Sequence, residues 1–401
     1  MEQQLTNNTT PSTLWGGLVL LAAVAAPLGY WMLQQRRRRR GGRRNLDQLT
    51  VQHSYTEFSD LVLPSLCSKE GMMYAGQLLS LLDIVGGTCA FKHCHGPIVT
   101  VTIDSVRFLA PAFAHDALIV SGRVNAVFRS SVEIEVTIEK ENLFQDHETR
   151  SVCCKGTLVF VHLDPKSRRP LKCPPLKMTT DQEKARSQAA LLRKQERAAE
   201  RSGMVSSNGN NRSSKERILW WKQQWPKEEH DLNALQTFSK ITFIETIPEN
   251  AHKYTATTNK VIMPQHANTL QIAFGGQVMF WMEQAAALAA IRFARKNVIT
   301  ASLDRMSFDK QSKVGDLLSL EAIVTRAFDK SLEVKVRVHS YQAGTTDPVF
   351  TNAGFFTFTA VDETQRSVAV GTQVRPVTEE TQKDFCEALR RREARLQEKS
   401  E

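Results

Sequence analysis

Apolar and polar positions alternate along two separate blocks of the chain, and a longer apolar run precedes each block. The alternation has a period of two residues, which is typical of half-buried strands. The run before the second block, residues 278–293, is apolar on nearly every face at helical spacing, with Glu283 and Gln284 in its middle. Such a helix either spans a membrane or is enclosed by protein, and the two polar residues favour enclosure. In the first block we expect a helix at 76–93 and strands at 98–108, 117–128, 132–140 and 151–162.

The two blocks are copies of one another. The stretch that starts near Pro64 aligns without a gap with the stretch that starts near Pro264. The same offset of 200 residues holds as far as Glu133 and Glu333, and it changes by two after a hairpin that is shorter in the second copy. A register held over this length indicates a tandem duplication. Each copy is expected to be an α+β unit in which a curved antiparallel sheet wraps one central helix.

The duplication divides the chain into domains and connecting segments. We interpret a charged helix at 180–201 as a solvated linker helix in preference to a brace between the copies, and we expect Trp220, Trp221 and Trp225 to pack onto a domain instead of stacking on a ligand. A second charged helix, capped by Thr378, follows the second copy. The expected boundaries are a polar N-terminus at 1–13, a transmembrane anchor at 14–33, an Arg-rich segment at 34–50, a first domain at 51–164, a charged linker at 165–240, a second domain at 241–362 and a C-terminal tail with a helix at 363–401.

Residues 14–33 contain no charged side chain, and their length is about what a helix needs to cross a bilayer at ~1.5 Å per residue. An arginine cluster beginning at Arg36 follows them, and the cytoplasmic flanks of membrane spans are rich in Lys and Arg. We therefore expect a single-pass anchor in the mitochondrial outer membrane or the endoplasmic reticulum, with the following domains in the cytosol. A targeting sequence that is removed and an amphipathic or buried segment are the alternatives.

The formal net charge of +10 is concentrated in one place, because seven arginines lie between residues 36 and 44. We interpret this basicity as a local targeting signal and expect no nucleic-acid partner. The seven cysteines include no CxxC spacing and are odd in number, which favours reduced thiols over a disulfide framework. His93, Cys94 and His95 are possible metal ligands, but no second pair matches them at a recognisable spacing. We therefore expect neither a metal nor a cofactor.

Four short motifs stand out in the second copy: Pro264-Gln265-His266-Ala267-Asn268, Gly275-Gly276-Gln277, Trp281-Met282-Glu283 and Val314-Gly315-Asp316. They resemble those of a known family, the tandem hot-dog acyl-CoA thioesterases, in particular the cytosolic and brown-fat types. The resemblance covers both copies and implies two hot-dog domains that form a pseudo-dimer within one chain. It also implies hydrolysis of fatty acyl-CoA to free acid and CoA, and further assembly into homo-oligomers. Those enzymes carry a C-terminal lipid-transfer domain, which we expect to be missing here, whereas the N-terminal span is an addition.

In that family each active site lies between two hot-dog units and combines an Asn from a loop of one unit with an acidic residue from the helix of the other. Carried over by position, the second copy supplies Asn268 and the first copy supplies Asp83. The reciprocal pair is Ser68 and Glu283, which lacks the amide. The resemblance therefore implies one complete catalytic site per chain and one degenerate site.

These residue types suit thioester hydrolysis. A carboxylate such as that of Asp83 is ionised near neutral pH unless strongly desolvated, and it can activate water. The amide of Asn268 and the backbone N–H groups at Gly275 and Gly276 are suitable donors to a developing oxyanion. The leaving thiol has a pKa of about 8.5 and needs little acid assistance. Each role has a structural alternative: a paired buried carboxylate for Asp83, a turn-holding side chain for Asn268, and close packing for the glycines.

Further residues are candidate contacts to the phosphates of CoA, although solvated surface positions are the simpler interpretation. The competing function is a non-catalytic acyl-CoA-binding scaffold, which the serine at position 68 keeps open. A hot-dog dehydratase or hydratase would need a histidine beside the acidic residue, and His266 is the nearby candidate. We favour the hydrolase. The candidate phosphate contacts are Arg107, Arg129, Lys310 and Lys313.

Overall fold

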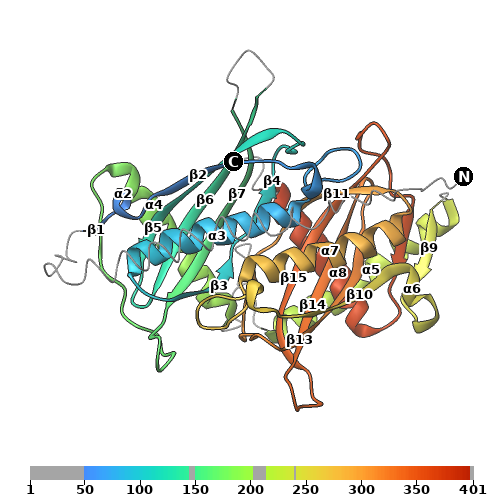
Figure 1. The fold of residues 1–401 in the computed structure, drawn as a ribbon. Helices are drawn as coiled ribbons and strands as arrows, with labels where there is room; N and C mark the ends of the chain where they lie inside the picture. The colour runs from blue at the N-terminus through green and yellow to red at the C-terminus, as the bar shows by residue number, and fades with distance from the viewer. Residues whose placement is uncertain (1–48, 144–149, 202–213, 239–240, 398–401) are drawn as a thin grey trace, which may run out of the picture. The chain divides into compact units, whose positions relative to one another are not determined.

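The computed structural model describes residues 49–143, 150–201, 214–238 and 241–397 (Figure 1). Residues Asp47–Glu401 form one compact unit. The segment expected to be a membrane anchor, 14–33, lies outside the described residues. Among the helices that the structure describes, none combines the length and the hydropathy of a membrane span.

The first repeat contains one long helix followed by antiparallel strands, as the alternation of its positions predicts. The helix ends at His95, whose φ of 55° is the left-handed conformation common after helix C-termini. The single strand expected at 98–108 is wrong, because the chain leaves the sheet at Asp104 and re-enters it at Val106. The elements are β1 Leu49–Thr50, α2 Val51–Ser54, β2 Thr56–Leu61, η2 Pro64–Leu66, α3 Ala75–Cys94, β3 Ile98–Ile103, β4 Val106–Phe108, β5 Asp116–Val127, β6 Ser131–Asn142, β7 Ser151–His162 and β8 Leu176–Lys177.

The second repeat follows the same order, and three further helices lie outside the two repeats. The elements of the second repeat are β9 Thr242–Glu245, η3 Pro248–Asn250, α6 Ala251–Tyr254, β10 Thr255–Val261, η4 Pro264–His266, α7 Gly275–Ala294, β11 Asn297–Leu303, β12 Met306–Ser307, β13 Leu317–Ala327, β14 Ser331–Tyr341, β15 Val349–Val361 and β16 Thr372–Arg375. The outer helices are α4 Asp181–Arg201, α5 Ser214–Phe238 and α8 Glu379–Gln397.

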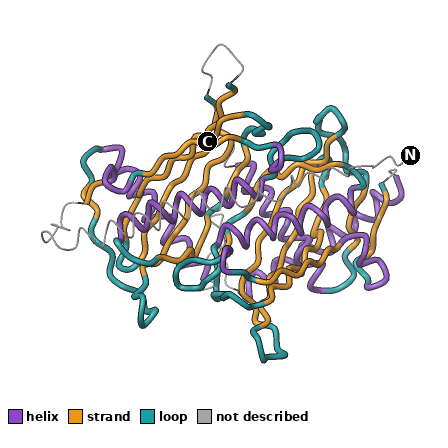
Figure 2. The backbone as a smooth tube through the Cα atoms, viewed as in Figure 1, coloured by secondary structure: helices purple, strands orange, loops and turns teal. Residues whose placement is uncertain are grey.

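Twelve described strands, β2–β7 of the first repeat and β10–β15 of the second, join in one sheet, whereas β1 pairs with β8 and β9 pairs with β16 in two small sheets. The main path of the large sheet runs β10-β13-β14-β15-β11-β4-β7-β6-β5-β2, and β3 and β12 pair beside that path. The repeats meet where β11 pairs with β4, with Ser302 opposite Arg107, and where β12 pairs with β3. Helices α3 and α7 pack against each other across one face of this sheet (Figures 1 and 2). The two repeats therefore share both a sheet and a helix layer, which is the arrangement of a pseudo-dimer within one chain.

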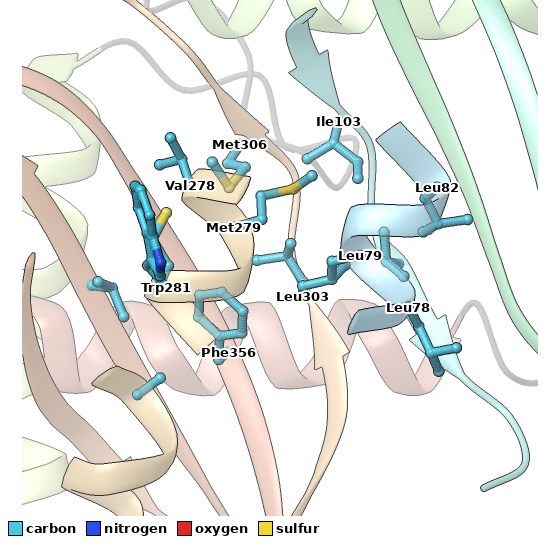
Figure 3. Packing of buried hydrophobic residues seen from close by; sticks show 14 of the residues in the cluster. Leu78, Leu79, Leu82, Ile103, Val278, Met279, Trp281, Leu303, Met306 and Phe356 are labelled. Atoms are coloured by element: carbon cyan, nitrogen blue, oxygen red, sulfur yellow. The ribbon is translucent and has the colours of Figure 1, made fainter. Parts of the chain in front are cut away.

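One continuous hydrophobic core runs through both repeats. Side chains of the two central helices meet side chains of both halves of the sheet, and Leu79, Met279, Leu303 and Phe356 are fully buried there (Figure 3). Burial of this apolar area is the main force that holds the repeats together.

The outer helix α4 is bound to the sheet by buried ion pairs. On β6 the apolar Ile134 and Val136 are buried on the side of the central helices, so the intervening positions point to the opposite face. Glu133 is completely buried there, and Arg197 of α4 lies 2.8 Å from its carboxylate and 2.7 Å from that of Asp104. Helix α4 therefore packs on the sheet of the first repeat, and its interpretation as a solvated linker helix is wrong. A brace between the repeats stays a prediction, which the pair of Glu196 of α4 with Arg305 of the second repeat at 3.2 Å supports.

The C-terminal helix α8 repeats this arrangement on the second half of the sheet. Arg391 lies 2.7 Å from Glu333, which is also fully buried, and Arg395 lies 2.6 Å from Asp304. Helices α4 and α8 thus each present two arginines, four residues apart, to the same two acidic positions of their repeat; in α4 these are Arg193 and Arg197. The duplication therefore includes α4 and α8, which lie beyond residues 164 and 362, where the sequence analysis ended the two domains.

Helix α5 was not expected from the pattern, because tryptophans, charges and Pro226 interrupt its apolar spacing. Its tryptophans pack onto α8, as expected. Trp221 is buried, and the ring of Trp225 lies edge-on to that of Phe385 at 6.3 Å. The cap expected for α8 is present, since the N–H of Thr381 donates to the hydroxyl of Thr378.

Candidate functional site

Asp83 lies in the middle of α3, at the point where α3 meets α7. Its side chain is 3% exposed. The hydroxyl of Thr100, on β3, donates to Oδ1 at 2.6 Å, and the backbone N–H of Gly276, the second residue of α7, donates to Oδ2 at 2.8 Å. One carboxylate therefore binds a side chain of its own repeat and the helix start of the other repeat.

Glycine at position 276 is what allows this approach. A Cβ atom there would lie 2.7 Å from Cβ of Asp83 and 2.9 Å from Cα of Ser80, which is closer than atoms can pack. The hydroxyl of Ser80 donates to the carbonyl of Gly276 at 3.1 Å and bonds the helices further. The close contact is between two helices, and not between helix and sheet as the structural alternative for this glycine assumed.

Burial controls the ionisation of Asp83. Desolvation raises the pKa of this carboxyl above its ordinary value, and the hydrogen bonds from Thr100 and Gly276 oppose that rise. A carboxylate with a raised pKa is a stronger base than an exposed aspartate. The two hydrogen bonds that the carboxylate accepts therefore favour its ionised form against the effect of burial.

Asn268 is held in the loop between η4 and α7. Its side-chain oxygen accepts the N–H groups of Leu270 and Ile272 at 2.9 and 3.2 Å, so the amide nitrogen is directed away from the loop. That nitrogen lies 3.4 Å from the carbonyl oxygen of Ile98 on β3. Leu270 and Ile272 pack in a small cluster with Val99 and so fix the loop on this strand. Asn268 and Asp83 thus approach the same strand at positions two residues apart.

The reciprocal pair shows the same carboxylate arrangement without the amide. The hydroxyl of Thr300 donates to Glu283 at 2.6 Å, and the backbone N–H of Gly76 also bonds this carboxylate. Burial raises the pKa of Glu283 as it does that of Asp83. The hydroxyl of Ser68, in contrast, donates to the side chain of its neighbour Glu70 at 2.8 Å.

The two threonines that bond the candidate carboxylates were missed by the sequence reasoning. Thr100 lies 17 positions after Asp83, and Thr300 lies 17 positions after Glu283. The repeat alignment contained this signal, because both copies have a threonine there. Its meaning was not apparent, because a strand residue and a helix residue at that separation are brought together only by the fold.

The other candidate residues lie at varying positions. A Cβ atom on Gly275 would touch Thr100 at 3.0 Å, so the first residue of α7 is also part of this site. Lys313 lies next to the Asn268 loop, because it forms a bridge with Ile272. Lys310 and Arg129 are exposed, and Arg107 lies on β4 at the join between the repeats.

His266, the candidate for dehydratase chemistry, is engaged within its own loop. Its Nδ1 accepts the N–H of Met263 at 3.1 Å, and its ring lies edge-on to Trp281 at 4.9 Å. Burial lowers its pKa, which favours a neutral ring. These contacts assign it to loop structure.

Comparison with known proteins identifies the family. The profile of the Thioesterase superfamily matches residues 70–143 and 270–346, one match in each repeat. A protein of Zymomonas mobilis, named an uncharacterized acyl-CoA thioester hydrolase, is 33% identical over 120 residues, which cover 30% of this chain and 78% of that protein. The chain belongs to the thioesterase superfamily. Its two matches confirm the expected tandem of hot-dog domains.

Longer members of the thioesterase superfamily align with both repeats. Mouse acyl-coenzyme A thioesterase 11 is 28% identical over 347 residues, or 86% of this chain and 53% of that protein.

A crystal structure described as an apo-hexameric acyl-CoA thioesterase matches 39% of this chain and 98% of its own, with 30% identity and a TM-score of 0.37. The chain spans 53–58% of the length of the first curated relatives that it matches.

Proposed function

We propose that the chain hydrolyses acyl-CoA thioesters to a carboxylic acid and CoA at one composite site per chain. Asp83 is the general base and Asn268 is a donor to the oxyanion. The proposal is supported above all by the convergence of both side chains on β3, Asp83 through Thr100 and Asn268 through Ile98. The names of the thioesterase-superfamily relatives suggest the same chemistry.

The attack begins with a water molecule beside Asp83. The carboxylate takes a proton from the water as the oxygen forms a bond with the thioester carbonyl carbon. Thr100 and Gly276 hold the carboxylate in place, so its orientation costs nothing at the moment of reaction. Burial raises the proton affinity of the base, which increases its power to activate water.

The carbonyl oxygen becomes negatively charged in the tetrahedral intermediate and needs donors. The amide of Asn268 is available, because its 3.4 Å contact with Ile98 is long for a hydrogen bond. The N–H of Gly275, at the positive end of the α7 dipole, is a second donor. The intermediate then collapses by breaking the C–S bond, and the thiolate of CoA leaves.

Asn268→Ala in the full-length chain tests this site. We expect the rate of CoA release from acyl-CoA to fall by about 10²-fold, because one oxyanion donor is lost. Ser68→Ala, at the equivalent position of the other repeat, is the matched control and should change the rate less than twofold or so. Equal losses in both variants would contradict a single working site. A wild-type chain that binds acyl-CoA without releasing CoA would establish the scaffold function instead.

The pH dependence of kcat/KM follows from the direction of the shift at Asp83. Because burial raises its pKa above about 3.9, the base is protonated and inactive at more acidic pH, and activity rises as pH increases through the shifted value. We expect an acidic limb with a midpoint above pH ~3.9. Glu283→Gln should keep the same limb, since that carboxyl belongs to the other pair. If Glu283→Gln lost the acidic limb, the limb would report the titration of Glu283, and Asp83 would not be the general base.

We also propose that residues 14–33 anchor the chain in a membrane with both domains in the cytosol. The uncharged run and the arginines that follow it support this orientation. Full-length chain expressed in cells should remain in the membrane pellet after carbonate extraction, whereas a chain without residues 1–45 should be released. The Asn211 sequon should stay unglycosylated. Glycosylation at Asn211, or release of the full-length chain by carbonate, would refute the proposal.

A further inference from the structure

Three metal-binding side chains from distant parts of the first repeat meet at the end of α3. They are Cys94, the last residue of α3, His162, the last residue of β7, and Cys173, in the segment that leads to β8. One ligand atom of each lies within 4.8 Å of the others. All three are buried, with exposures of 4%, 8% and 3%. The sequence predicted no metal here because the ligands are separated by up to 79 residues.

The distance between the two sulfur atoms fits a shared metal ion. Sγ of Cys94 lies 3.8 Å from Sγ of Cys173. Two thiolates bound at about 2.3 Å to a tetrahedral Zn²⁺ are about 3.8 Å apart, whereas the sulfurs of a disulfide are about 2.05 Å apart. The observed separation matches that of two thiolates on one ion, and across it the thiol of Cys94 donates a hydrogen bond to the sulfur of Cys173 in this structure.

The imidazole of His162 provides an independent observation. Its Nδ1 atom is buried and has no hydrogen-bond partner in the part of the chain that the structure describes. Buried polar atoms are nearly always partnered, and an unpartnered one needs an explanation such as a bound ion. Gly96 leaves the room for this ring, since a Cβ atom there would lie 2.5 Å from Nε2 of His162.

Neighbouring residues fix the ligands in place. The ring of His93 bonds the hydroxyl of Ser54 at 3.0 Å and the carbonyl of Pro174 at 2.9 Å, which holds the residue after Cys173 against the end of α3. The N–H of Cys173 donates to the carbonyl of Arg129 at 3.0 Å. His93 therefore supports the site and is not a ligand. The sequence had offered His93, Cys94 and His95 as possible ligands, and of these the proposed site uses Cys94.

The second repeat shows that the fold does not need polar residues at this corner. Cys173 and Val370 donate equivalent backbone hydrogen bonds, to Arg129 and Asp329, and are therefore counterparts. By the same register Cys94 corresponds to Ala294, and His162 corresponds to Ala360. The second repeat thus fills this corner with three buried apolar side chains. The Cys/His/Cys set is an addition to the first repeat alone.

We propose that Cys94, His162 and Cys173 bind one Zn²⁺ ion that fastens the end of α3 to the end of β7 and to the linker. Two thiolates and an imidazole are ligands that Zn²⁺ prefers, and a water molecule would complete the tetrahedron. The site is separate from the proposed hydrolysis, which uses no metal.

The test measures zinc in the full-length chain after incubation with Zn²⁺ and removal of unbound metal. We expect about one equivalent per chain, as a single set of ligands requires. The triple variant Cys94→Ala, His162→Ala, Cys173→Val reproduces the packing of the second repeat and should fold but retain only background zinc. Cys89→Ala and Cys386→Ala, which remove buried thiols elsewhere, should retain the full equivalent.

A second measurement uses the unaltered chain, so that the result does not depend on a variant. Co²⁺ added in place of Zn²⁺ should give thiolate-to-metal charge-transfer absorption and the strong d–d bands of a tetrahedral site, both of which Zn²⁺ should abolish. The proposal is wrong if the wild-type chain binds no stoichiometric zinc, if the triple variant binds as much as the wild type, or if a Cys94–Cys173 disulfide is found in the purified protein.

Discussion

Asp83→Asn is expected to lower kcat for acyl-CoA hydrolysis by about 10²-fold or more, because the amide cannot accept the proton of the attacking water. The substitution keeps the shape of the side chain and an oxygen that can accept the N–H of Gly276. The fold and the binding of substrate should therefore change little, and KM should stay within about threefold of the wild type. CoA release at saturating substrate measures the effect.

Glu283→Gln is the matched control, because Glu283 has the same burial and the same types of hydrogen bond in the other repeat. Its loss in kcat should stay below about twofold, since Ser68 supplies no amide to that pair. If Glu283→Gln were as damaging as Asp83→Asn, both pairs would be catalytic, or both carboxylates would act through the fold. Circular dichroism of both variants distinguishes these two cases.

Arg197→Met is expected to destabilise the packing of α4 by about 3 kcal/mol, because it leaves buried carboxylates with fewer positive partners. Arg197 is 7% exposed and bonds both Asp104 and Glu133. Methionine has a similar helix propensity to arginine, so the decrease in stability measures the contribution of the ion pairs. Amide hydrogen exchange along α4 and the urea midpoint of the full chain measure it.

Lys184→Met in the same helix is the control for that measurement. Lys184 pairs with Asp181, and both side chains are largely exposed, at 63% and 96%. Exposed pairs contribute little, so a change within about 0.5 kcal/mol is expected. Equal effects of the two substitutions would show that the buried ion pairs do not hold α4 on the sheet.

Helices α3, α4, α7 and α8 and most strands could be predicted from the sequence because their signals are local. The apolar run that starts at Gly76 fixed α3 to within one residue at each end. The break at Asp104 could not be predicted, since its carboxylate is bonded by Arg197, 93 residues away. Helix α5 was missed for a related reason. Trp225 is an apolar residue of this helix because it packs on Phe385 of α8, and the spacing of apolar residues within α5 does not show this contact.

The candidate site could be predicted only in part. Asp83 and Asn268 were predicted from the resemblance to a known family, and the alignment of the two repeats showed which copy keeps each residue. The contribution of Thr100 depends on a helix lying on a strand, and the meeting of Cys94, His162 and Cys173 depends on where three separate elements end. Contacts of this kind arise from the folded chain. The alignment of the repeats therefore showed a threonine at both positions without showing what it contacts, and it gave no sign of the Cys94, His162 and Cys173 cluster.

The carboxylates of Asp83 and Glu283 each accept the N–H at the start of the other repeat's helix. The two halves are therefore obligate companions, because either one expressed alone would have a helix whose first turn misses its acceptor. An acid at position 283 therefore has a structural role of its own, because it accepts the N–H of Gly76 at the start of α3.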